Sequence, residues 1–183
     1  MWRKQPVGED TERVVSDPER SRKRTMDRAV RLLAAKPRSI AELRERLLEK
    51  LWTNDEIVDA VIEKLIEYSY LDDGKFAADT AMSKLRQKPQ GRRRLQQVMS
   101  LKKLDKETVD AAIDAAFEKH PESNLIDVSI EKRIRLKGHP ATRDETKKFY
   151  DHLMRQGFSY GLIREKLDAL PTPVPADDAS DSI

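Results

Sequence analysis

A helical pattern of apolar residues that repeats itself is the feature that most constrains how this 183-residue chain can fold. From residue 26 to residue 170, apolar side chains recur at helical spacing, and no sustained alternation of apolar and polar residues indicates a strand. Shifting the sequence by 52 positions against itself sets Leu43 opposite Leu95, with similar matches on both sides. A further shift of 54 sets Phe149 opposite Leu95. The chain is therefore predicted to hold three copies of one helical unit.

Each copy has room for three helices separated by prolines and polar residues. The predicted helices are 25–36, 39–51 and 54–69, then 73–87, 91–103 and 106–119, then 124–137, 144–156 and 160–169. Three helices of this size enclose too little core to be robust alone, so neighbouring copies should support one another. The predicted fold is all-α: an elongated, curved array of three tandem three-helix repeats.

The two ends of the chain differ in kind from the repeats. Residues 1–24 lack periodicity and close on a basic cluster, which predicts a flexible basic extension. Residues 171–183, PTPVPADDASDSI, combine three prolines with three aspartates, which predicts a disordered acidic tail. The repeats between them are expected at residues 25–71, 72–121 and 122–170.

Composition limits the kind of protein. Hydrophobic and charged residues each make up 38% of the chain, which suits thin helical layers with much surface. The absence of cysteine excludes disulfides, thiolate nucleophiles and zinc–thiolate sites. No run approaches the roughly 20 apolar residues that a membrane helix needs, and the N-terminus lacks the apolar core of an export signal. We expect a soluble, cytoplasmic protein that does not contact a membrane.

Several residues have the character of helix N-caps. Thr53 with Glu56 three residues later predicts a capping box, and Ser39 is expected to cap the helix that follows it. Asp72 and Asp73 could be paired catalytic acids or magnesium ligands. Their position before a helix favours capping and first-turn charge instead.

One segment carries charge of a single sign. From Lys84 to Lys103 there are eight cationic side chains and no acid. Arg92, Arg93 and Arg94 fall at the start of a predicted helix, where the macrodipole disfavours each cation by about 0.3–1 kcal/mol at most. Arginines at such a position are easier to understand if they meet phosphates or carboxylates of a partner. An ordinary solvated surface is the alternative.

A second basic run lies on the first predicted helix of the third repeat. Asp127 and Glu131 dilute its charge, so a solvated helix face and a phosphate contact are equally open there. If the basic runs share one side of the molecule, they form an electrostatic track for nucleic acid. The predicted filament-binding or DNA-binding residues are Arg86, Lys88, Arg92, Arg93, Arg94, Lys102, Lys103, Lys132, Arg133, Arg135 and Lys137.

The sequence assembles no catalytic constellation. His120, His139 and His152 lack the spacing of a metal site. Neither a GxxxxGK(S/T) loop nor a GxGxxG motif after a strand is present. We therefore predict no catalytic residue, no metal ligand and no cofactor, and a protein that acts by binding.

A set of short motifs spread over about residues 25–170 carries a family resemblance. The motifs are Arg28-Ala29-Val30-Arg31-Leu32-Leu33-Ala34, Ser39-x-x-Glu42-Leu43-x-x-x-Leu47, Tyr70-Leu71-Asp72-Asp73-x-x-Phe76-Ala77, Gly91 before an arginine-rich helix, and Arg155-Gln156-Gly157-Phe158. Together they resemble the RecX family of bacterial recombination regulators, and the Leu-Asp-Asp-x-x-Phe-Ala segment is the most specific of them.

The resemblance implies tandem three-helix units and a non-enzymatic role in homologous recombination and DNA repair. It implies a protein that binds the RecA recombinase filament on DNA, lies along the helical groove of that filament, and restrains ATP hydrolysis and strand exchange. The expected partners are thus a RecA-type filament and single- or double-stranded DNA contacted through phosphates, and the protein is expected to be a monomer.

The chain departs from the family pattern where the second helix of a repeat ends. The family tends to place Lys-Gly before an apolar residue there, but this chain has Lys50-Leu51-Trp52 and Lys102-Lys103-Leu104, and keeps glycine only at Gly157. A left-handed cap without glycine costs about 1 kcal/mol, so these helices could run on or turn differently.

Two other functions fit the same residues. A stand-alone helical DNA-binding protein could use three-helix units with basic helices in the manner of helix-turn-helix domains. A generic helical scaffold for other proteins would need neither DNA nor a recombinase.

Overall fold

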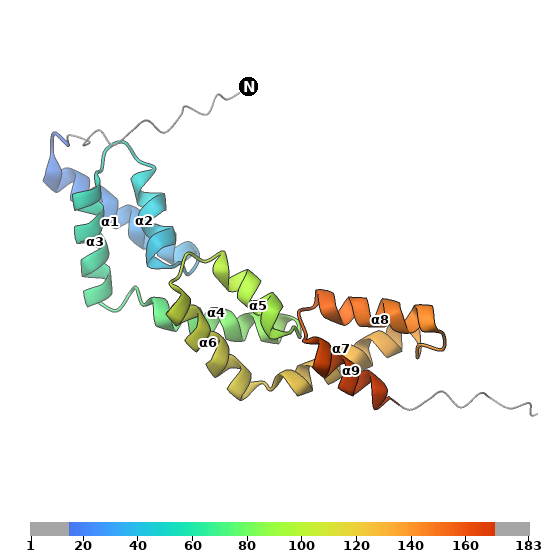
Figure 1. Ribbon diagram of the computed structural model, residues 1–183. Helices are drawn as coiled ribbons and strands as arrows, with labels where there is room; N and C mark the ends of the chain where they lie inside the picture. Colours follow the sequence, from blue (N-terminus) through green and yellow to red (C-terminus); the bar gives the residue numbers. More distant parts are fainter. Residues whose placement is uncertain (1–14, 171–183) are drawn as a thin grey trace, which may run out of the picture. The chain divides into compact units, whose positions relative to one another are not determined.

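The computed structural model describes residues 15–170, and this part of the chain is entirely helical, without strands (Figure 1). The helices are α1 (Pro18–Ala35), α2 (Ile40–Leu48), α3 (Asp55–Glu67), α4 (Asp73–Gln87), α5 (Arg92–Ser100), α6 (Lys106–Lys119), α7 (Glu122–Lys137), α8 (Arg143–Arg155) and α9 (Tyr160–Asp168). The prediction of an all-α chain is confirmed. None of the helices within these residues combines the length and apolarity needed to cross a bilayer. The predicted acidic tail lies outside the described residues.

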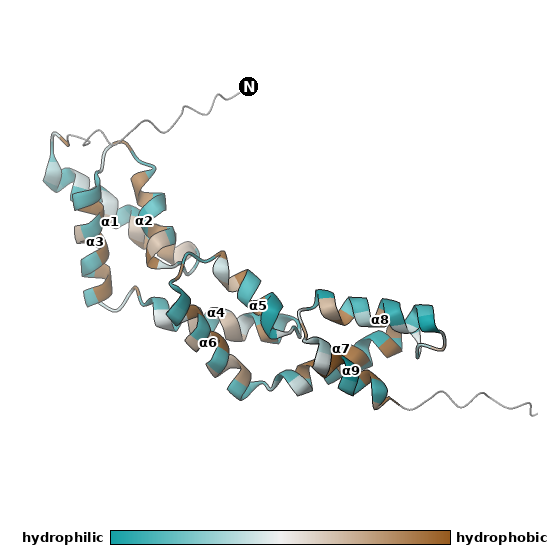
Figure 2. Cartoon of the chain, viewed as in Figure 1, coloured by the Kyte–Doolittle hydropathy of each residue, from teal (hydrophilic) through white to brown (hydrophobic). Residues whose placement is uncertain are grey.

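The described residues fall into two compact units. Unit 1 holds the residues up to Phe76 together with Lys102–Leu104, and unit 2 holds Ala77–Leu101 and the residues from Asp105 onward. Figure 2 shows that most helices carry both apolar and polar residues along their length, as helices of small bundles do.

The core of unit 1 lies among α1, α2 and α3. Its buried apolar side chains are Ala29, Leu43, Leu47, Val58, Val61, Ile62, Leu65 and Leu71. These residues follow the spacing that predicted the helices, because one face of each helix supplies them.

Helix α1 begins at Pro18, seven residues before the predicted start, so the prediction of a flexible extension up to residue 24 is wrong for its last turns. Asp17 caps the helix by accepting from the backbone N–H of Arg20 at 3.0 Å. The buried residue of the added turns is Ser21, and Thr25, the first residue of the predicted helix, is buried as well, so neither buried position is apolar. Apolar periodicity therefore does not indicate the first turns of α1.

Hydrogen bonds make these polar positions tolerable in the interior. Ser21 Oγ donates to the carbonyl of Trp52, and Thr25 Oγ1 lies 3.1 Å from Thr53 Oγ1. The Thr53 hydroxyl therefore hydrogen-bonds to a residue of α1, and Thr53 does not form the predicted capping box. Asn54 caps α3 instead, since its Oδ1 accepts from the N–H of Ile57 at 3.0 Å.

Two predicted caps are confirmed. Ser39 Oγ accepts from the N–H of Glu42 at 3.1 Å, and Asp72 Oδ1 accepts from the N–H of Lys75 at 2.9 Å. Asp73 accepts from the N–H of Ile40 at 2.9 Å, so this carboxylate also serves the start of α2. The capping interpretation of the two aspartates therefore holds.

The helix ends without glycine behave differently from one another. Lys103 takes a φ of 55°, the left-handed conformation that glycine would adopt more cheaply, and Gly157 takes 90° at the corresponding place. Across residues 15–170, the only other non-glycine residue with positive φ is Ser69, so the turn after α2 closes without a left-handed residue.

Unit 2 holds a second and a third helical group. The buried side chains of α5 and α6 include Leu95, Met99, Val109 and Ile113. The core of the third group consists of Ile126, Ile130, Phe149, Leu153, Phe158 and Ile163.

A backbone contact joins these two groups, and we call it the seam: residues 91–94 against residues 156–158. The N–H of Gly91 donates to the carbonyl of Gln156 at 2.9 Å, and the N–H of Arg93 donates to the carbonyl of Gly157 at 3.3 Å. Glu122 Oε1 accepts from the N–H of Arg92 at 3.0 Å. The first turn of α5 is therefore capped from outside, since Gly91 has no side chain to do so.

Gly91→Ala is expected to destabilise the protein by about 2 kcal/mol or more, because overpacking against backbone cannot relax easily. The added methyl carbon would lie 2.3 Å from the carbonyl of Gly157. The φ of Gly91 is −81°, which any residue adopts, so the cost is steric. Urea denaturation measures the change in the free energy of unfolding.

Gly161→Ala is the matched control for this substitution. A Cβ at Gly161 meets nothing within 4 Å, so its effect should stay within about 0.5 kcal/mol. Equal unfolding midpoints for Gly91→Ala and Gly161→Ala would contradict the tight seam.

Candidate functional site

A basic groove lies in unit 2 where the seam brings α4, α5 and α8 together. Its volume is about 220 Å³. It is lined by Lys84, Gln87, Lys88, Gln90, Arg94, Val98, Arg155 and Gln156. Four of these side chains are cationic and three are amides, and none is a carboxylate.

Local structure explains why these cations converge. Lys84 lies in the last turn of α4, and Lys88 directly follows the end of that helix at Gln87. The backbone N–H of Lys88 still donates to the carbonyl of Lys84 at 3.1 Å, so the two residues lie on the same side. Arg94 lies in the first turn of α5, with its backbone against Gly157. Arg155 is the last residue of α8, one residue before the seam. The seam thus places Arg155 beside cations that are some sixty residues away in the sequence.

The groove carries uncompensated positive charge. Within residues 15–170, no carboxylate lies within ion-pairing distance of Lys84, Lys88, Arg94 or Arg155. Like charges gathered in one concave site raise the local potential and attract anions. The arrangement is suited to phosphate or carboxylate groups, which accept charge-assisted hydrogen bonds from lysine and arginine.

The pKa of His152 responds to the positive charge of the groove. Its pKa is lowered first by burial and then by the positive charges of Arg133, Arg155 and Lys88. Its Nε2 lies 2.8 Å from Nε2 of Gln156, and since an amide nitrogen only donates, the ring nitrogen accepts. A protonated imidazolium could not accept this bond, so contact and field both favour neutral histidine.

The three consecutive arginines of α5 lie in different environments. Arg92 Nη1 lies 2.6 Å from Asp114 Oδ1, and its guanidinium is 5.3 Å from the centre of the Phe117 ring, so it is engaged by α6 at the surface of the second helical group. Arg93 is exposed, and Arg94 lines the groove.

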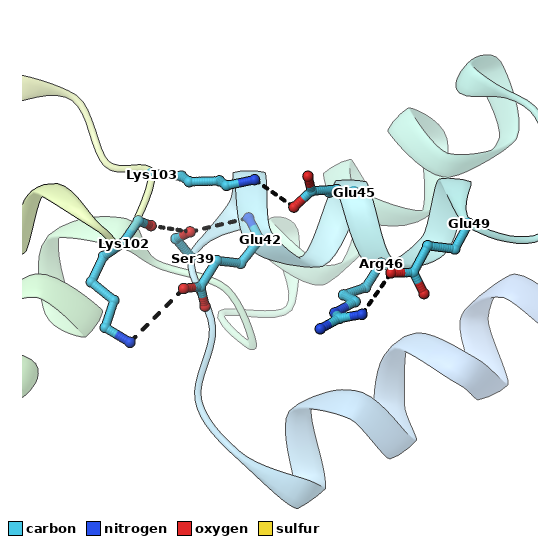
Figure 3. Close-up of polar contacts among 7 residues, drawn as sticks. All are labelled: Ser39, Glu42, Glu45, Arg46, Glu49, Lys102 and Lys103. Atoms are coloured by element: carbon cyan, nitrogen blue, oxygen red, sulfur yellow. Dashed lines mark hydrogen bonds and ion pairs between the residues drawn. The ribbon is translucent and has the colours of Figure 1, made fainter. Parts of the chain in front are cut away.

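Lys102 and Lys103 belong to unit 1 and face its acids (Figure 3). Lys102 Nζ lies 3.9 Å from Glu42, and Lys103 Nζ donates to Glu45 at 2.5 Å, which lowers the pKa of that carboxyl. Ser39 Oγ also donates to the Lys102 carbonyl at 2.7 Å. These contacts fasten the turn after α5 to α2.

The basic residues of α7 divide in the same way. Arg133 stacks over Phe149 at 5.1 Å and donates to the carbonyl of Lys148, so it packs within the third group. Lys132, Arg135 and Lys137 are exposed and have no carboxylate within ion-pairing distance among residues 15–170.

Arg86 of α4 lines a separate, more open cavity of about 540 Å³ with Asp79 and Lys119.

Sequence reasoning missed part of the groove. Lys84 and Arg155 were not among the predicted binding residues, nor were Gln90 and Gln156. The sequence signal that could have found them is the pair Gly91 and Gly157. Glycine allows two backbone segments to approach closely, so two such glycines indicate segments that could touch. In the described part of the chain, no cluster of three or more histidine or acidic side chains could hold a metal ion.

The fold and groove define a class: an all-α protein of tandem three-helix repeats with an anion-attracting site. Family models agree, since the RecX first three-helix domain matches residues 26–65 and the RecX second three-helix domain matches residues 72–113.

Comparisons with individual proteins extend the match. The protein named Regulatory protein RecX from Prosthecochloris aestuarii is 30% identical over 150 residues, covering 82% of this chain and 95% of that protein. Its namesake from Chlorobaculum tepidum is 31% identical over 141 residues, covering 76% and 84%. The crystal structure of RecX from Lactobacillus salivarius has a TM-score of 0.73 at 19% identity, covers 83% of this chain and 99% of its own, and shows the same fold. The chain belongs to the RecX family.

Charge reversal in the groove is expected to raise the pKa of His152. Lys88→Glu and Arg155→Glu each remove a positive neighbour and add a negative one, and both changes favour the imidazolium. NMR titration of the imidazole signals should show an upward shift of roughly half a pH unit or more. Lys147→Glu, an exposed cation elsewhere on α8, is the control. An unchanged His152 titration in both groove variants would contradict the proximity.

Proposed function

We propose that this protein binds the RecA-type recombinase filament on DNA and inhibits or modulates its ATP hydrolysis and strand exchange, acting as a cytoplasmic monomer and without catalysis. Membership of the RecX family supports the proposal, since its curated relatives are named regulatory proteins. The observation that carries it is the groove in which Lys88, Arg94 and Arg155 converge without a neutralising acid in the described chain. Such a site needs an anionic partner.

The proposed contact residues follow from how each cation is held. Arg86, Lys88, Arg93, Arg94, Lys132, Arg135 and Lys137 are exposed and carry no ion pair within residues 15–170, and the groove adds Lys84 and Arg155. Arg92, Lys102, Lys103 and Arg133 already have partners in the fold, so they would bind an anion only by sharing or exchanging them. The first set is therefore the proposed binding surface, and the second set supports it.

The proposed mechanism is bridging. Repeats that hold two successive recombinase subunits favour the arrangement in which both contacts are made. They thereby oppose the subunit rearrangement that turnover and strand exchange require. The groove contributes by binding DNA phosphates or an acidic surface of the recombinase.

The direct experiment follows ATP hydrolysis by a RecA recombinase on single-stranded DNA while this protein is added. Hydrolysis should fall as the protein approaches stoichiometry with the recombinase. Unchanged hydrolysis at a stoichiometric excess would reject the regulatory function.

A stand-alone DNA-binding function is the second candidate, favoured by the cationic groove itself. It predicts DNA binding without recombinase that weakens steeply as salt rises. Fluorescence anisotropy of a labelled oligonucleotide between about 50 and 200 mM salt separates the two. Tight binding to bare DNA with no effect on the recombinase would favour this alternative.

The double variant Lys88→Glu/Arg155→Glu is expected to raise the concentration needed for half-inhibition by on the order of tenfold or more, because charge-assisted contacts turn into repulsion. Lys147→Glu/Lys148→Glu reverses two exposed charges on the same helix and is the matched control. Circular dichroism should show unchanged helix content for both. Equal inhibition by the two variants would remove the groove from the mechanism.

A further inference from the structure

The basic groove gathers four cations without a counter-charge among the described residues, although several other cations of the fold have one. Arg92 pairs with Asp114, Lys103 with Glu45, and Lys166 with Asp127. The four cations of the groove have no carboxylate in ion-pairing distance within residues 15–170. Concentrated charge of one sign destabilises a compact state through repulsion. An acidic segment close at hand would relieve it.

The groove is also lined by amide groups that can form hydrogen bonds with a ligand. Gln90 is only 7% exposed and lines the groove. The Oε1 atom of Gln156 is buried without a partner within the described chain. Buried amides normally find partners, so this lining is suited to a ligand with hydrogen-bonding atoms. A volume of about 220 Å³ admits a few short side chains, not a folded domain.

The sequence supplies such a segment in the same chain. Residues 171–183 read PTPVPADDASDSI, with aspartates at 177, 178 and 181 and no lysine, arginine or histidine. The segment follows Leu170, whose side chain packs against the core of the third helical group in unit 2. Groove and segment are therefore tethered to one compact unit.

The tether is long enough to return to the groove. Helix α9 has nine residues and spans about 14 Å, the four steps from Gln156 to its start add at most about 14 Å, and the two steps from Asp168 to Leu170 add at most about 7 Å. Leu170 thus lies within roughly 35 Å of the groove. Seven to eleven extended residues separate Leu170 from the aspartates, a reach of about 23–36 Å.

We infer that the basic groove binds the acidic segment 171–183 of its own chain, with Asp177, Asp178 or Asp181 facing Lys88, Arg94 and Arg155. The segment then competes with any anionic partner for the groove. This inference rests on the groove described above and deepens the proposed function, since it names a regulator of the same site.

Each ion pair in this contact is weak, but the tether keeps the contact populated. A short tether keeps the segment near its site at an effective concentration of about millimolar, so even weak ion pairs are populated. Exposed ion pairs are screened by salt, with a Debye length of about 10 Å at 0.1 M. The segment should therefore leave the groove at high salt or when a polyanion with more charges arrives.

The test uses the full chain with one added label. Because the sequence has no cysteine, Ser180→Cys gives a single site for a nitroxide spin label. At low salt, the amide NMR signals of Lys88, Arg94 and Gln156 should lose more than half of their intensity relative to the reduced label. The same labelled chain with Asp177→Asn, Asp178→Asn and Asp181→Asn is the control, and most of the intensity should return.

Two results would overturn the inference. One is full intensity at the groove amides at low salt, and the other is equal broadening in the chain with neutral asparagines. The measurement contains neither recombinase nor DNA, so it separates this inference from the proposed function.

A competition experiment measures the consequence. The variant with three asparagines should bind a labelled oligothymidylate several-fold more tightly than the original chain at low salt, and the difference should vanish when Lys88→Glu/Arg155→Glu is added to both. A several-fold gain that persists in the groove variant would assign the effect to overall charge and overturn the inference.

Discussion

The seam between residues 91–94 and 156–158 is the contact on which the candidate site of this structure depends. Two backbone N–H groups at the start of α5 donate to carbonyls of the turn between α8 and α9, and Glu122 accepts a third. A helix start has N–H groups without partners inside the helix, and here a neighbouring repeat supplies those partners. The close approach requires glycine on both sides, since a Cβ on either Gly91 or Gly157 would come within 2.3 Å of the other segment's backbone.

The groove is a consequence of that contact. Lys88 belongs to the turn before the seam, Arg94 to the helix after it, and Arg155 to the end of α8. Each cation is ordinary by itself, and the site exists because the seam places them around one cavity. Burial and this positive field both lower the pKa of His152. Packing between repeats therefore contributes stability and also forms a groove lined by cations, as expected for repeat proteins whose units support one another.

The sequence predicted the helices well because one buried apolar stripe per helix sets the period, and Leu43, Leu95 and Phe149 mark the same position in three repeats. It failed where polar residues occupy buried positions, as Ser21 and Thr25 do in α1. The candidate site was half predicted. Lys88 and Arg94 stand in a visible basic run, but Arg155 joins them only through tertiary structure, and Asp114 removes Arg92 from the free cations. Charge patterns along the sequence reveal neither the approach of Arg155 to the groove nor the ion pair of Arg92 with Asp114.

Hydrogen exchange at the seam tests the central claim most directly. The amides of Gly91 and Arg93 point at backbone carbonyls of residues 156 and 157, so exchange should require opening of unit 2. We predict protection as strong as that of the buried residues Leu95 and Ile163, both in the original chain and in Lys88→Glu/Arg155→Glu, which alters the groove but not the seam. Exchange of Gly91 and Arg93 at the rate of an exposed loop would contradict the account, because the groove would then have no fixed frame.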